Sequence, residues 1–287
     1  MDIKKNVAMK NHTSFKIGGL ADEFCEAKSV EEIKELAEYA KGKNIPYYVI
    51  GNGTNLLVSD KGIRGLVIKI AGSFSRYTVD GDKIISESGA LLSVLASAAQ
   101  KNSLSGMEFA SGIPGTLGGA IYMNAGAYGG EMKDVLLSVA SVNALGIMKD
   151  RKAEDLGLGY RRSIYMENGE TILGVKLFLK PGLRSEIEET MRDFNQRRNT
   201  KQPVHLPSAG SFFKRPEGYF AGKLIEDAGL KGLQVGGAQV SPMHAGFLVN
   251  NGGATAQDVI DLMRIVQETV AEKFGVYLEP EVRIVGE

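Results

Sequence analysis

The sequence predicts an α+β fold, in which helices and strands are mixed along the chain without strict alternation. Two observations favour this class. Amphipathic helical periodicity occurs near both ends of the chain, at 29–43 and at 255–275. Short apolar runs bounded by glycine lie between these helices, and a loop, not a helix, joins the first two runs. A chain of 287 residues with 43% hydrophobic content is long enough for about two domains.

The first predicted helix spans 29–43, where Ser29 and Glu32 are expected to form a capping box. Its apolar face comprises Val30, Ile33, Leu36, Ala37 and Ala40. The segment IPYYVIG is predicted as a short buried strand that ends at Gly51. After the loop GNGTNLLVSDKG, the segment IRGLVIKI is predicted as a second strand. This order does not match the strand-to-helix turn of a Rossmann fingerprint.

Further elements are expected as a helix at 89–102, strands at 135–142 and 171–179, and a polar helix at 184–201. The proline-marked loop KQPVHLPSAG follows and predicts a domain boundary at about residue 200.

The C-terminal part is expected to contain a helix near YFAGKLIEDAG and a long helix at 255–275. Thr255 and Asp258 are expected to cap the long helix. Its apolar stripe lies at 259, 262, 263, 266 and 270, and LEPEVRIVGE is predicted as a final strand.

Composition excludes several function classes. Lysine plus arginine equals aspartate plus glutamate at 34 each, so no basic surface for nucleic acid or anionic lipid is indicated. No apolar run approaches the ~20 residues of a membrane span, and the N-terminus lacks a signal-peptide core. The single cysteine, Cys25, excludes an intramolecular disulfide, and three scattered histidines give no metal-ligand spacing.

The stretch SGIPGTLGGAIYMNAGAYGGE at 111–131 contains seven glycines. A flexible linker would be polar, whereas this stretch carries Ile113, Leu117, Ile121 and Tyr122 between its glycines. Dense glycine among residues that favour burial indicates a backbone that closely approaches a ligand.

The loop GNGTNLL at 51–57 is either an ordinary turn or an anion-binding concavity built from backbone N–H groups. Together with the stretch at 111–131 it could clasp a cofactor that contains pyrophosphate. No Walker-type lysine follows either segment, so an ATPase loop is not supported.

Ser211, in SAGSFFKRP, is either a nucleophile or proton donor, or a serine that bonds nearby backbone groups. No G-x-S-x-G elbow surrounds it. Glu281, in LEPEVR, lies in an apparent buried strand and is either paired, with Arg283 nearby, or functional.

The pair Arg161–Arg162 follows Tyr160 in GYRRSIY. Arginine can bind a carboxylate or phosphate with two parallel hydrogen bonds, although adjacent arginines are more often plain surface charge.

Seven motifs in this order resemble one family: NHTSFKIGG, GNGTNLLVSD, SGIPGTLGGAIYMNAGAYGGE, GYRRSIY, SAGSFFKRP, HAGFLVN and LEPEVRIVG. The family is that of the UDP-N-acetylenolpyruvoylglucosamine reductases, the FAD-containing MurB enzymes of bacterial peptidoglycan synthesis, and the resemblance is to its shorter, type II-like members. It implies a two-lobed FAD-binding domain of the PCMH/vanillyl-alcohol-oxidase-like kind plus a smaller α+β substrate-binding domain. The implied lobes are 1–75 and 76–195, the substrate-binding domain is 196–277, and the strand 278–287 returns to the FAD-binding part.

The resemblance also implies a reaction. NADPH would reduce noncovalently bound FAD, and the flavin N5 would deliver hydride to C3 of the enolpyruvyl group of UDP-N-acetylglucosamine-enolpyruvate, which yields UDP-N-acetylmuramate. Arg161 would bind the enolpyruvyl carboxylate, a protonated Glu281 with a raised pKa would help to polarise it, and Ser211 would donate a proton to C2.

The residues that the resemblance assigns to ligands fall into two sets. The cofactor set comprises Gly51, Asn52, Gly53, Thr54, Asn55 and Leu56 of the first loop, with Gly112, Gly115, Thr116, Gly118, Gly119, Ala120, Asn124 and Gly126 of the second stretch. The set that faces substrate or nicotinamide comprises Tyr160, Lys201, Arg215 and His244.

Three other classes remain open at this point. A related FAD oxidase would have the same broad fold and another substrate; covalent flavin attachment is disfavoured because no histidine lies within 51–57 or 111–131. A noncatalytic nucleotide-binding module would need neither Ser211 nor Glu281. A structural α+β protein would use the glycines only for turns. We expect a cytoplasmic monomer with a small-molecule substrate, without metal, nucleic-acid or membrane partners.

Overall fold

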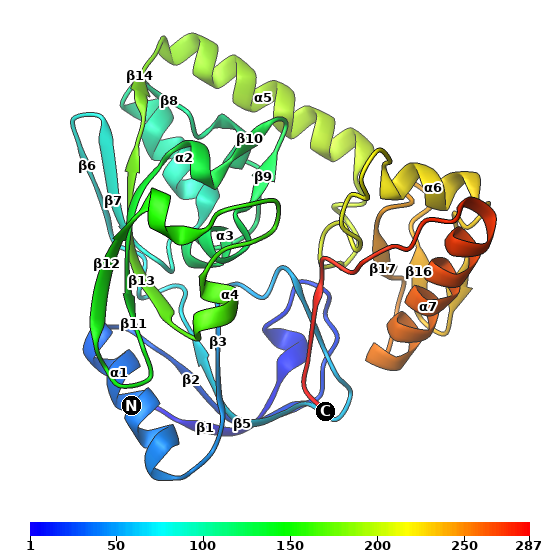
Figure 1. The fold of residues 1–287 in the computed structure, drawn as a ribbon, viewed down its shortest axis with the longest axis horizontal. Coiled ribbons are helices and arrows are strands. Elements are labelled where there is room, and N and C mark those ends of the chain that lie inside the picture. The colour runs from blue at the N-terminus through cyan, green and yellow to red at the C-terminus, as the bar shows by residue number, and fades with distance from the viewer. The chain divides into compact units, whose positions relative to one another are not determined.

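The computed structural model describes all 287 residues, and the chain divides into two compact units (Figure 1). Unit 1 comprises 1–3, 25–52 and 66–197, and unit 2 comprises 4–24, 53–65 and 198–287. Each unit is therefore assembled from three separate stretches of the chain. None of the helices combines the length and the apolarity needed to cross a membrane.

Helices and strands are interspersed along both units. The helices are α1 (Val30–Gly42), α2 (Leu92–Lys101), α3 (Leu117–Met123), α4 (Tyr165–Asn168), α5 (Arg184–Lys201), α6 (Ala221–Asp227) and α7 (Ala256–Phe274). The first nine strands are β1 (Lys4–Ala8), β2 (Leu20–Glu26), β3 (Tyr47–Ile50), β4 (Leu56–Val58), β5 (Ile63–Lys69), β6 (Tyr77–Asp80), β7 (Lys83–Glu87), β8 (Leu104–Ser105) and β9 (Gly126–Ala127). The others are β10 (Gly130–Glu131), β11 (Leu136–Val142), β12 (Met148–Lys152), β13 (Thr171–Phe178), β14 (Lys180–Pro181), β15 (Gln234–Val235), β16 (Ala238–Val240), β17 (Leu248–Asn250) and β18 (Arg283–Val285).

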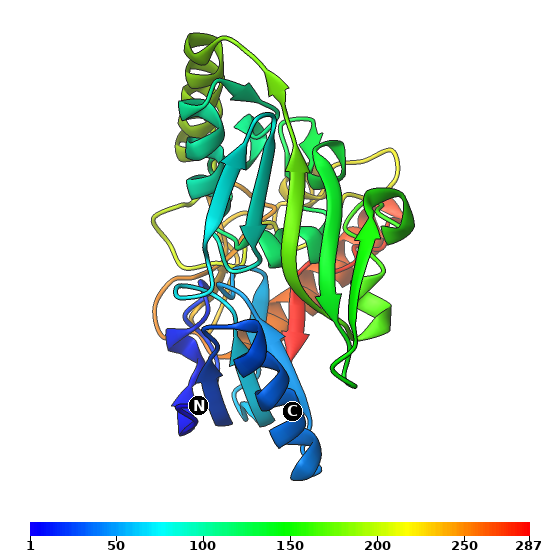
Figure 2. The same cartoon turned by 90° about the vertical axis from the view of Figure 1, so that its left-hand side faces the viewer.

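Unit 1 is built on an antiparallel sheet of five strands in the order β12-β11-β13-β7-β6. Alternate residues such as Ile84, Val139 and Val175 point into the main core of this unit, which α2 and α3 complete. The opposite face of the sheet is turned toward the viewer in Figure 2, and it exposes Ile85 and Phe178. One face of the sheet is thus buried under α2 and α3, whereas Val142 of β11 and Leu173 of β13 are buried in the separate core around α1.

Helix α1 forms a second core in unit 1 with the strands near it. Ile33 and Leu36 are buried there with the Cys25 side chain. The Ser29 hydroxyl accepts a hydrogen bond from the Glu32 N–H at 3.1 Å, as predicted, but the Glu32 carboxylate accepts from Lys28 N–H and not from Ser29. Two side-chain hydrogen bonds therefore cap the N-terminus of α1. The bond accepted by Glu32 comes from Lys28, one residue before the position expected for a capping box.

Strand β3 differs from the prediction. It pairs in parallel with β5, as Tyr47↔Leu66 through Ile50↔Lys69, but it is the edge strand of its sheet. Tyr48 and Val49 are consequently 41% and 37% exposed, so the expectation of a buried strand was wrong.

In unit 2, α7 packs against the three-stranded sheet β15-β16-β17 and against α6. Thr255 and Asp258 form the predicted capping box at the start of α7. The Asp60 carboxylate adds a second cap, because it accepts the N–H groups of Ala256 and Gln257 at 2.8 and 3.0 Å. An aspartate near the first turn of a helix also interacts favourably with the helix dipole.

Two expectations about local structure need correction. The glycine-rich stretch at 111–131, for which no helix was predicted, contains α3. The first N–H groups of this helix, those of Leu117 and Gly118, donate to the carbonyls of Ala90 and Ser88 at 2.8 and 2.7 Å. Glu281 was expected inside a strand, but β18 begins at Arg283 and Glu281 lies half-buried just before it.

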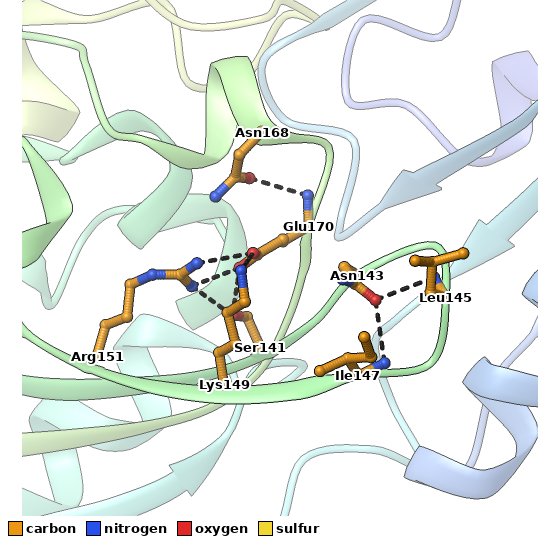
Figure 3. Close-up of polar contacts among 8 residues, drawn as sticks. All are labelled: Ser141, Asn143, Leu145, Ile147, Lys149, Arg151, Asn168 and Glu170. Carbon is orange, nitrogen blue, oxygen red and sulfur yellow. Dashed lines mark hydrogen bonds and ion pairs between the residues drawn. The ribbon is translucent and has the colours of Figure 1, made fainter.

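A buried ion pair joins Glu170, which lies just after α4, to Arg151 on β12, the edge strand of the unit 1 sheet (Figure 3). Arg151 binds both oxygens of Glu170, the Nη2–Oε1 distance being 2.7 Å, and the Ser141 hydroxyl donates to the same carboxylate at 2.7 Å. Lys149 lies 3.2 Å from it. These donors hold the pKa of Glu170 well below its ordinary value of 4.5, at about 2.

We predict that Glu170→Gln destabilises the protein by about 3 kcal/mol at neutral pH, because a shift of this size is about 1.4 kcal/mol per pKa unit. A lowered folded-state pKa stabilises the native state above the unfolded-state pKa, and this contribution is lost as pH falls from about 4.5 toward about 2. Urea unfolding at pH 7 and at pH 3 measures both effects.

The matched control is Glu154→Gln, which removes a carboxylate that is 75% exposed and paired only loosely with Lys152 at 3.8 Å. It should change the free energy of unfolding by less than about 0.5 kcal/mol. Equal effects of the two substitutions would show that the Glu170 cluster contributes no special stability.

Candidate active site

Ser211 and Glu281 are brought onto neighbouring segments of unit 2 by the residue that follows the serine. The Phe212 N–H donates to the Gly246 carbonyl at 2.8 Å, and the Phe212 carbonyl accepts from Glu281 N–H at 2.8 Å. The Phe212 side chain is fully buried. One backbone residue therefore fixes the segments of Ser211, Glu281 and Gly246 relative to each other.

The Ser211 side chain itself is exposed, and no hydrogen bond ties its hydroxyl to the protein. Gly210 before it has a φ of +79°, a left-handed conformation that favours glycine. The interpretation that Ser211 satisfies nearby backbone groups is therefore not supported, and the hydroxyl remains available for a ligand.

The loop GNGTNLL reaches the Glu281 segment through Asn55. The Asn55 Nδ2 donates to the Glu281 carbonyl at 3.1 Å, and the Arg283 N–H donates to the Asn55 carbonyl at 3.0 Å. The parallel pairing of β4 with β18 continues this contact from Leu56↔Arg283 onward. Thr54 is half-buried in the same turn. The predicted cofactor loop and the predicted acid thus share one piece of backbone structure.

Ser14 also organises this region, although only its place in the motif NHTSFKIGG marked it in the sequence. Its N–H donates to the Gly53 carbonyl at 3.1 Å, and its hydroxyl donates to the Ser208 carbonyl at 2.6 Å. Gly53 has a φ of +64°, and a Cβ there would lie 2.1 Å from the His12 carbonyl oxygen. Gly53 is therefore required by the close approach of the 12–14 backbone.

In unit 1 the two glycine-rich segments meet directly. The Asn52 Nδ2 donates to the Pro114 carbonyl at 3.0 Å, and a Cβ on Gly51 would lie 2.1 Å from the Thr116 Oγ1. Gly115 is half-buried between these residues, and its carbonyl accepts from Leu92 N–H at 3.1 Å. The two glycine-rich segments therefore lie together at this point, as a clasp around a cofactor would require.

The remaining glycines of the second stretch differ in their surroundings. A Cβ on Gly118 would lie 2.9 Å from Ser88 Cβ, whereas a Cβ on Gly119 would meet nothing closer than Thr116 Oγ1 at 3.5 Å. Gly119 is exposed, Gly112 is half-exposed, and Ala120 is buried in the core. Gly118 therefore serves internal packing, and Gly119 is the position where backbone is open to a ligand.

Asn124 lies wholly inside the protein. Its Nδ2 donates to the Gly159 carbonyl at 2.9 Å and to Glu131 at 3.1 Å, and its Oδ1 accepts from Lys133 N–H at 3.0 Å. The side chain thus links the β9–β10 hairpin, which contains Gly126, to the start of the turn that carries Tyr160 and Arg161.

That turn holds Arg161 in a strained conformation. Gly159 and Arg162 exchange two backbone hydrogen bonds of 3.1 and 3.2 Å, so Tyr160 and Arg161 are the central residues of a tight hairpin. Arg161 has a φ of +52°, and its Nη2 donates to the Gly126 carbonyl at 3.4 Å. Arg162 pairs instead with the exposed Glu167 at 3.1 Å. A strained non-glycine residue at a tight turn is a frequent mark of a functional site.

The other predicted ligand residues are spread over unit 1 and unit 2. The Arg161 guanidinium lies 4.8 Å from the Tyr160 ring centroid in unit 1. In unit 2, Lys201 ends α5 and is exposed, and the Arg215 guanidinium lies 3.9 Å from the Phe220 ring centroid. His244 is half-buried against Phe247. No group of three or more histidine, cysteine, aspartate or glutamate side chains gathers that could hold a metal ion.

Known proteins match the chain over nearly its full length. Residues 21–150 match the family model of an FAD binding domain, and residues 202–285 match that of the UDP-N-acetylenolpyruvoylglucosamine reductase C-terminal domain. The UDP-N-acetylenolpyruvoylglucosamine reductase of Alkaliphilus oremlandii (strain OhILAs) is 57% identical over 279 residues, which are 97% of this chain and 92% of the relative. That of Clostridioides difficile (strain 630) is 51% identical over 286 residues, which are 100% and 94%. The chain belongs to the UDP-N-acetylenolpyruvoylglucosamine reductase family.

Solved structures agree with this membership. The crystal structure of the family member from Thermus caldophilus is similar with a TM-score of 0.87 at 38% identity, and 100% of each chain is covered. A solvent-stable cholesterol oxidase shares the fold alone, with a TM-score of 0.50 at 16% identity over 62% of this chain. The predicted fold class, an FAD-binding fold of the PCMH-like kind within an α+β chain, is confirmed, and the structural-protein and noncatalytic alternatives are excluded.

The residues present fit the FAD that this family binds. The contact of Asn52 with Pro114 holds the two glycine-rich segments together, and Gly119 leaves backbone uncovered beside them. Backbone N–H groups freed by glycine are suited to phosphate oxygens. The particular roles of the cofactor, substrate and catalytic residues stay predictions.

We predict that Arg161→Gly raises the free energy of unfolding by about 1 kcal/mol, because glycine adopts a φ of +52° without the strain that arginine bears. Chemical denaturation measures the change. Arg162→Gly, at the neighbouring position without a positive φ, is the matched control and should lower stability by about 0.5–1 kcal/mol. A loss of stability in both variants would contradict the strain at Arg161.

We predict that Gly119→Val leaves the fold intact but strongly reduces FAD retention, because the new side chain meets no tight protein contact and enters the open space beside the loops. The flavin-to-protein ratio after purification measures retention, and circular dichroism checks the fold. Gly42→Val in α1, another exposed helical glycine with nothing within 4 Å of its Cβ, is the control. Normal flavin content in Gly119→Val would refute the assignment of this loop.

Proposed function

We propose that Arg161, Ser211 and Glu281 carry out the reaction of this enzyme, a UDP-N-acetylmuramate dehydrogenase that reduces the enolpyruvyl group of UDP-N-acetylglucosamine-enolpyruvate to give UDP-N-acetylmuramate. Family membership supports the reaction. The single observation that supports the residue assignment is the backbone pairing at Phe212, which brings the Ser211 and Glu281 segments together although 69 residues separate Phe212 from Glu281.

Arg161 is proposed to bind the carboxylate of the enolpyruvyl group. The tight turn holds its backbone, and Asn124 holds the Gly159 carbonyl that precedes it. A guanidinium can bind a carboxylate with two parallel hydrogen bonds, which fixes both the position and the plane of the substrate. A rigid turn makes this geometry available before the substrate arrives, so less entropy is lost on binding.

Glu281 is proposed to act in the protonated form as a hydrogen-bond donor to the same carboxylate. Hydride addition at C3 places negative charge on C2 and on the carboxylate as an enolate. A neutral acid together with Arg161 stabilises that charge as it forms, and donors that are already in position do so without reorganisation. The hydrogen bonds of the Glu281 N–H and carbonyl keep this residue in place.

Ser211 is proposed to donate the proton to C2. Its exposed hydroxyl has no partner within the protein, which suits a group that must reach the substrate. Gly210 and the buried Phe212 on either side define its position. A serine hydroxyl is a weak acid, so a water molecule or a further donor is expected to replace its proton.

FAD, when bound, supplies the redox chemistry by accepting hydride from NADPH and passing it to the substrate. The chain contributes the loops 51–57 and 111–131 that hold the cofactor noncovalently. Tyr160, Lys201 and Arg215 are proposed to face substrate or nicotinamide.

The lobes 1–75 and 76–195, the substrate-binding domain 196–277 and the strand 278–287 stay predictions. So do a cytoplasmic location, a monomeric state and the absence of nucleic-acid and membrane partners. A role in cell-wall biogenesis, and through it in cell shape, division and the cell cycle, follows from the proposed product.

We predict that Ser211→Ala leaves the reduction of FAD by NADPH within about twofold of the wild-type rate but slows reoxidation by the enolpyruvyl substrate by at least about 10²-fold. The hydroxyl acts only in the second half-reaction. Anaerobic stopped-flow absorbance near 450 nm separates the two steps, and analysis of the product confirms UDP-N-acetylmuramate.

Ser208→Ala is the matched control for this experiment, since it removes a hydroxyl three residues away whose backbone carbonyl, not its side chain, makes the contact with Ser14. It should leave both half-reactions close to wild type. Equal losses in the two half-reactions of Ser211→Ala would exclude the proton-donor role. Bleaching by NADPH without reoxidation by the substrate in the wild type would instead indicate a different substrate.

A further inference from the structure

His244 is connected to the Ser211 segment by a short series of hydrogen bonds. The imidazole Nδ1 accepts the Gly246 N–H at 3.1 Å. The Gly246 carbonyl accepts the Phe212 N–H at 2.8 Å, one residue from Ser211. Because Nδ1 accepts a hydrogen bond, it carries no proton, and the neutral ring must bear its proton on Nε2.

The imidazole packs closely against two glycines. A Cβ on Gly246 would lie 3.0 Å from the His244 Cε1, and a Cβ on Gly222 of α6 would lie 3.2 Å from it. The Phe247 ring contacts the imidazole edge-on, with centroids 5.0 Å apart. The Ser241 hydroxyl accepts the His244 N–H at 3.3 Å. The ring therefore has little room to turn away from the Gly246 amide.

The charges around the ring do not favour its protonation. Burial lowers the pKa of His244 below its ordinary value of 6.5. A hydrogen bond of the ring to its own backbone raises the pKa, Lys231 lowers it, and Glu226 of α6 raises it. Lys231 and Glu226 pair with each other at 3.1 Å, so their effects on the ring largely offset. The net effect is a lowered pKa, which favours the neutral ring whose Nδ1 accepts the Gly246 N–H.

We propose that His244 is a positioning residue for the proton donor. Its neutral imidazole holds the Gly246 N–H. The Gly246 carbonyl, on the next peptide unit, holds the Phe212 amide and with it the Ser211 backbone. This inference rests on the proposed role of Ser211, and it differs from the expectation that His244 contacts substrate or nicotinamide directly. Protonation of Nδ1 would replace an acceptor by a donor opposite the Gly246 N–H and release the segment.

Two substitutions separate positioning from direct contact. In His244→Asn the side-chain oxygen can occupy the place of Nδ1 and accept the N–H two residues later. This chain already uses that arrangement at Asn143 with Leu145 and at Asn168 with Glu170, both at 2.9 Å (Figure 3). In His244→Gln the longer side chain places its amide near the former Nε2 and removes the acceptor for Gly246.

In stopped-flow experiments, His244→Gln should slow flavin reoxidation by the enolpyruvyl substrate by about 10²-fold, because a small displacement of a reacting group has an effect of that order. Reduction by NADPH should stay within about twofold of wild type. His244→Asn should restore most of the lost rate. The wild-type reoxidation rate should also fall at acidic pH, and this fall should be absent in His244→Asn, which has no titrating ring.

Amide hydrogen exchange of the flavin-loaded protein provides a readout that does not depend on activity. The Phe212 and Gly246 amides should exchange at least about 10-fold faster in His244→Gln than in wild type, and at near wild-type rates in His244→Asn. His205→Gln, at an exposed histidine, is the control and should change neither exchange nor rates.

Equal rate losses in His244→Asn and His244→Gln, with normal exchange in both, would show that the imidazole contacts a ligand and would overturn the positioning role. Unchanged rates and exchange in His244→Gln would do the same. If wild-type flavin is not reoxidised by the enolpyruvyl substrate, the proposed function fails, whereas the exchange experiment still tests the link from His244 to Phe212.

Discussion

The backbone of Phe212 is the contact on which the arrangement of unit 2 depends. Its N–H and carbonyl are shared between Gly246 on one side and Glu281 on the other, at 2.8 Å each. The side chain is fully buried, so water competes poorly for these two backbone groups. Breaking either bond would leave a buried polar group without a partner. The exposed Ser211 beside it can therefore be precise in position without any bond of its own.

Well-defined backbone around exposed or strained functional groups is also found in unit 1. Arg161 adopts a left-handed φ that costs free energy, and the turn persists because its surroundings define it. Asn124 holds the residue before the turn, and the Arg151–Glu170 pair anchors the chain after α4. Removing one partner from a buried polar contact of this kind destabilises the protein, because the other partner is left buried without it. These contacts therefore help to hold the backbone in one arrangement.

The sequence predicted the elements whose local signals agree with their surroundings. The helix expected at 184–201 has those bounds in the structure, and Thr255 with Asp258 caps α7 as expected. Strand β1 was not predicted because the first three of its residues KKNVA are polar and exposed, two of them lysines, which leaves no alternating apolar pattern. Helix α3 was missed because glycine disfavours helices, and only contacts with Ser88 and Ala90 from a distant segment reveal why it forms.

The residues of the candidate site also fall into those that the sequence predicted and those that only the structure reveals. Glycine-rich motifs and the residues Arg161, Ser211 and Glu281 could be named from short stretches of sequence. The bond from Asn55 to Glu281 spans 226 positions, and the roles of Ser14 and Gly246 depend on backbone groups that carry no residue-specific signal. Such contacts follow only from the folded chain.

Unit 2 is assembled from segments that lie far apart in the chain, and this has a consequence for synthesis of the protein. Strand β4, from the first quarter of the chain, pairs with β18 at 283–285, and Asp60 caps α7. A growing polypeptide on the ribosome can complete unit 1, whose residues all precede 198, while unit 2 still lacks its partners. The segments of Ser211 and Glu281 can pair only after residue 281 has been synthesised and has left the ribosome. The proposed catalytic groups should therefore come together only after all of unit 1, the larger of the two units, is available to fold.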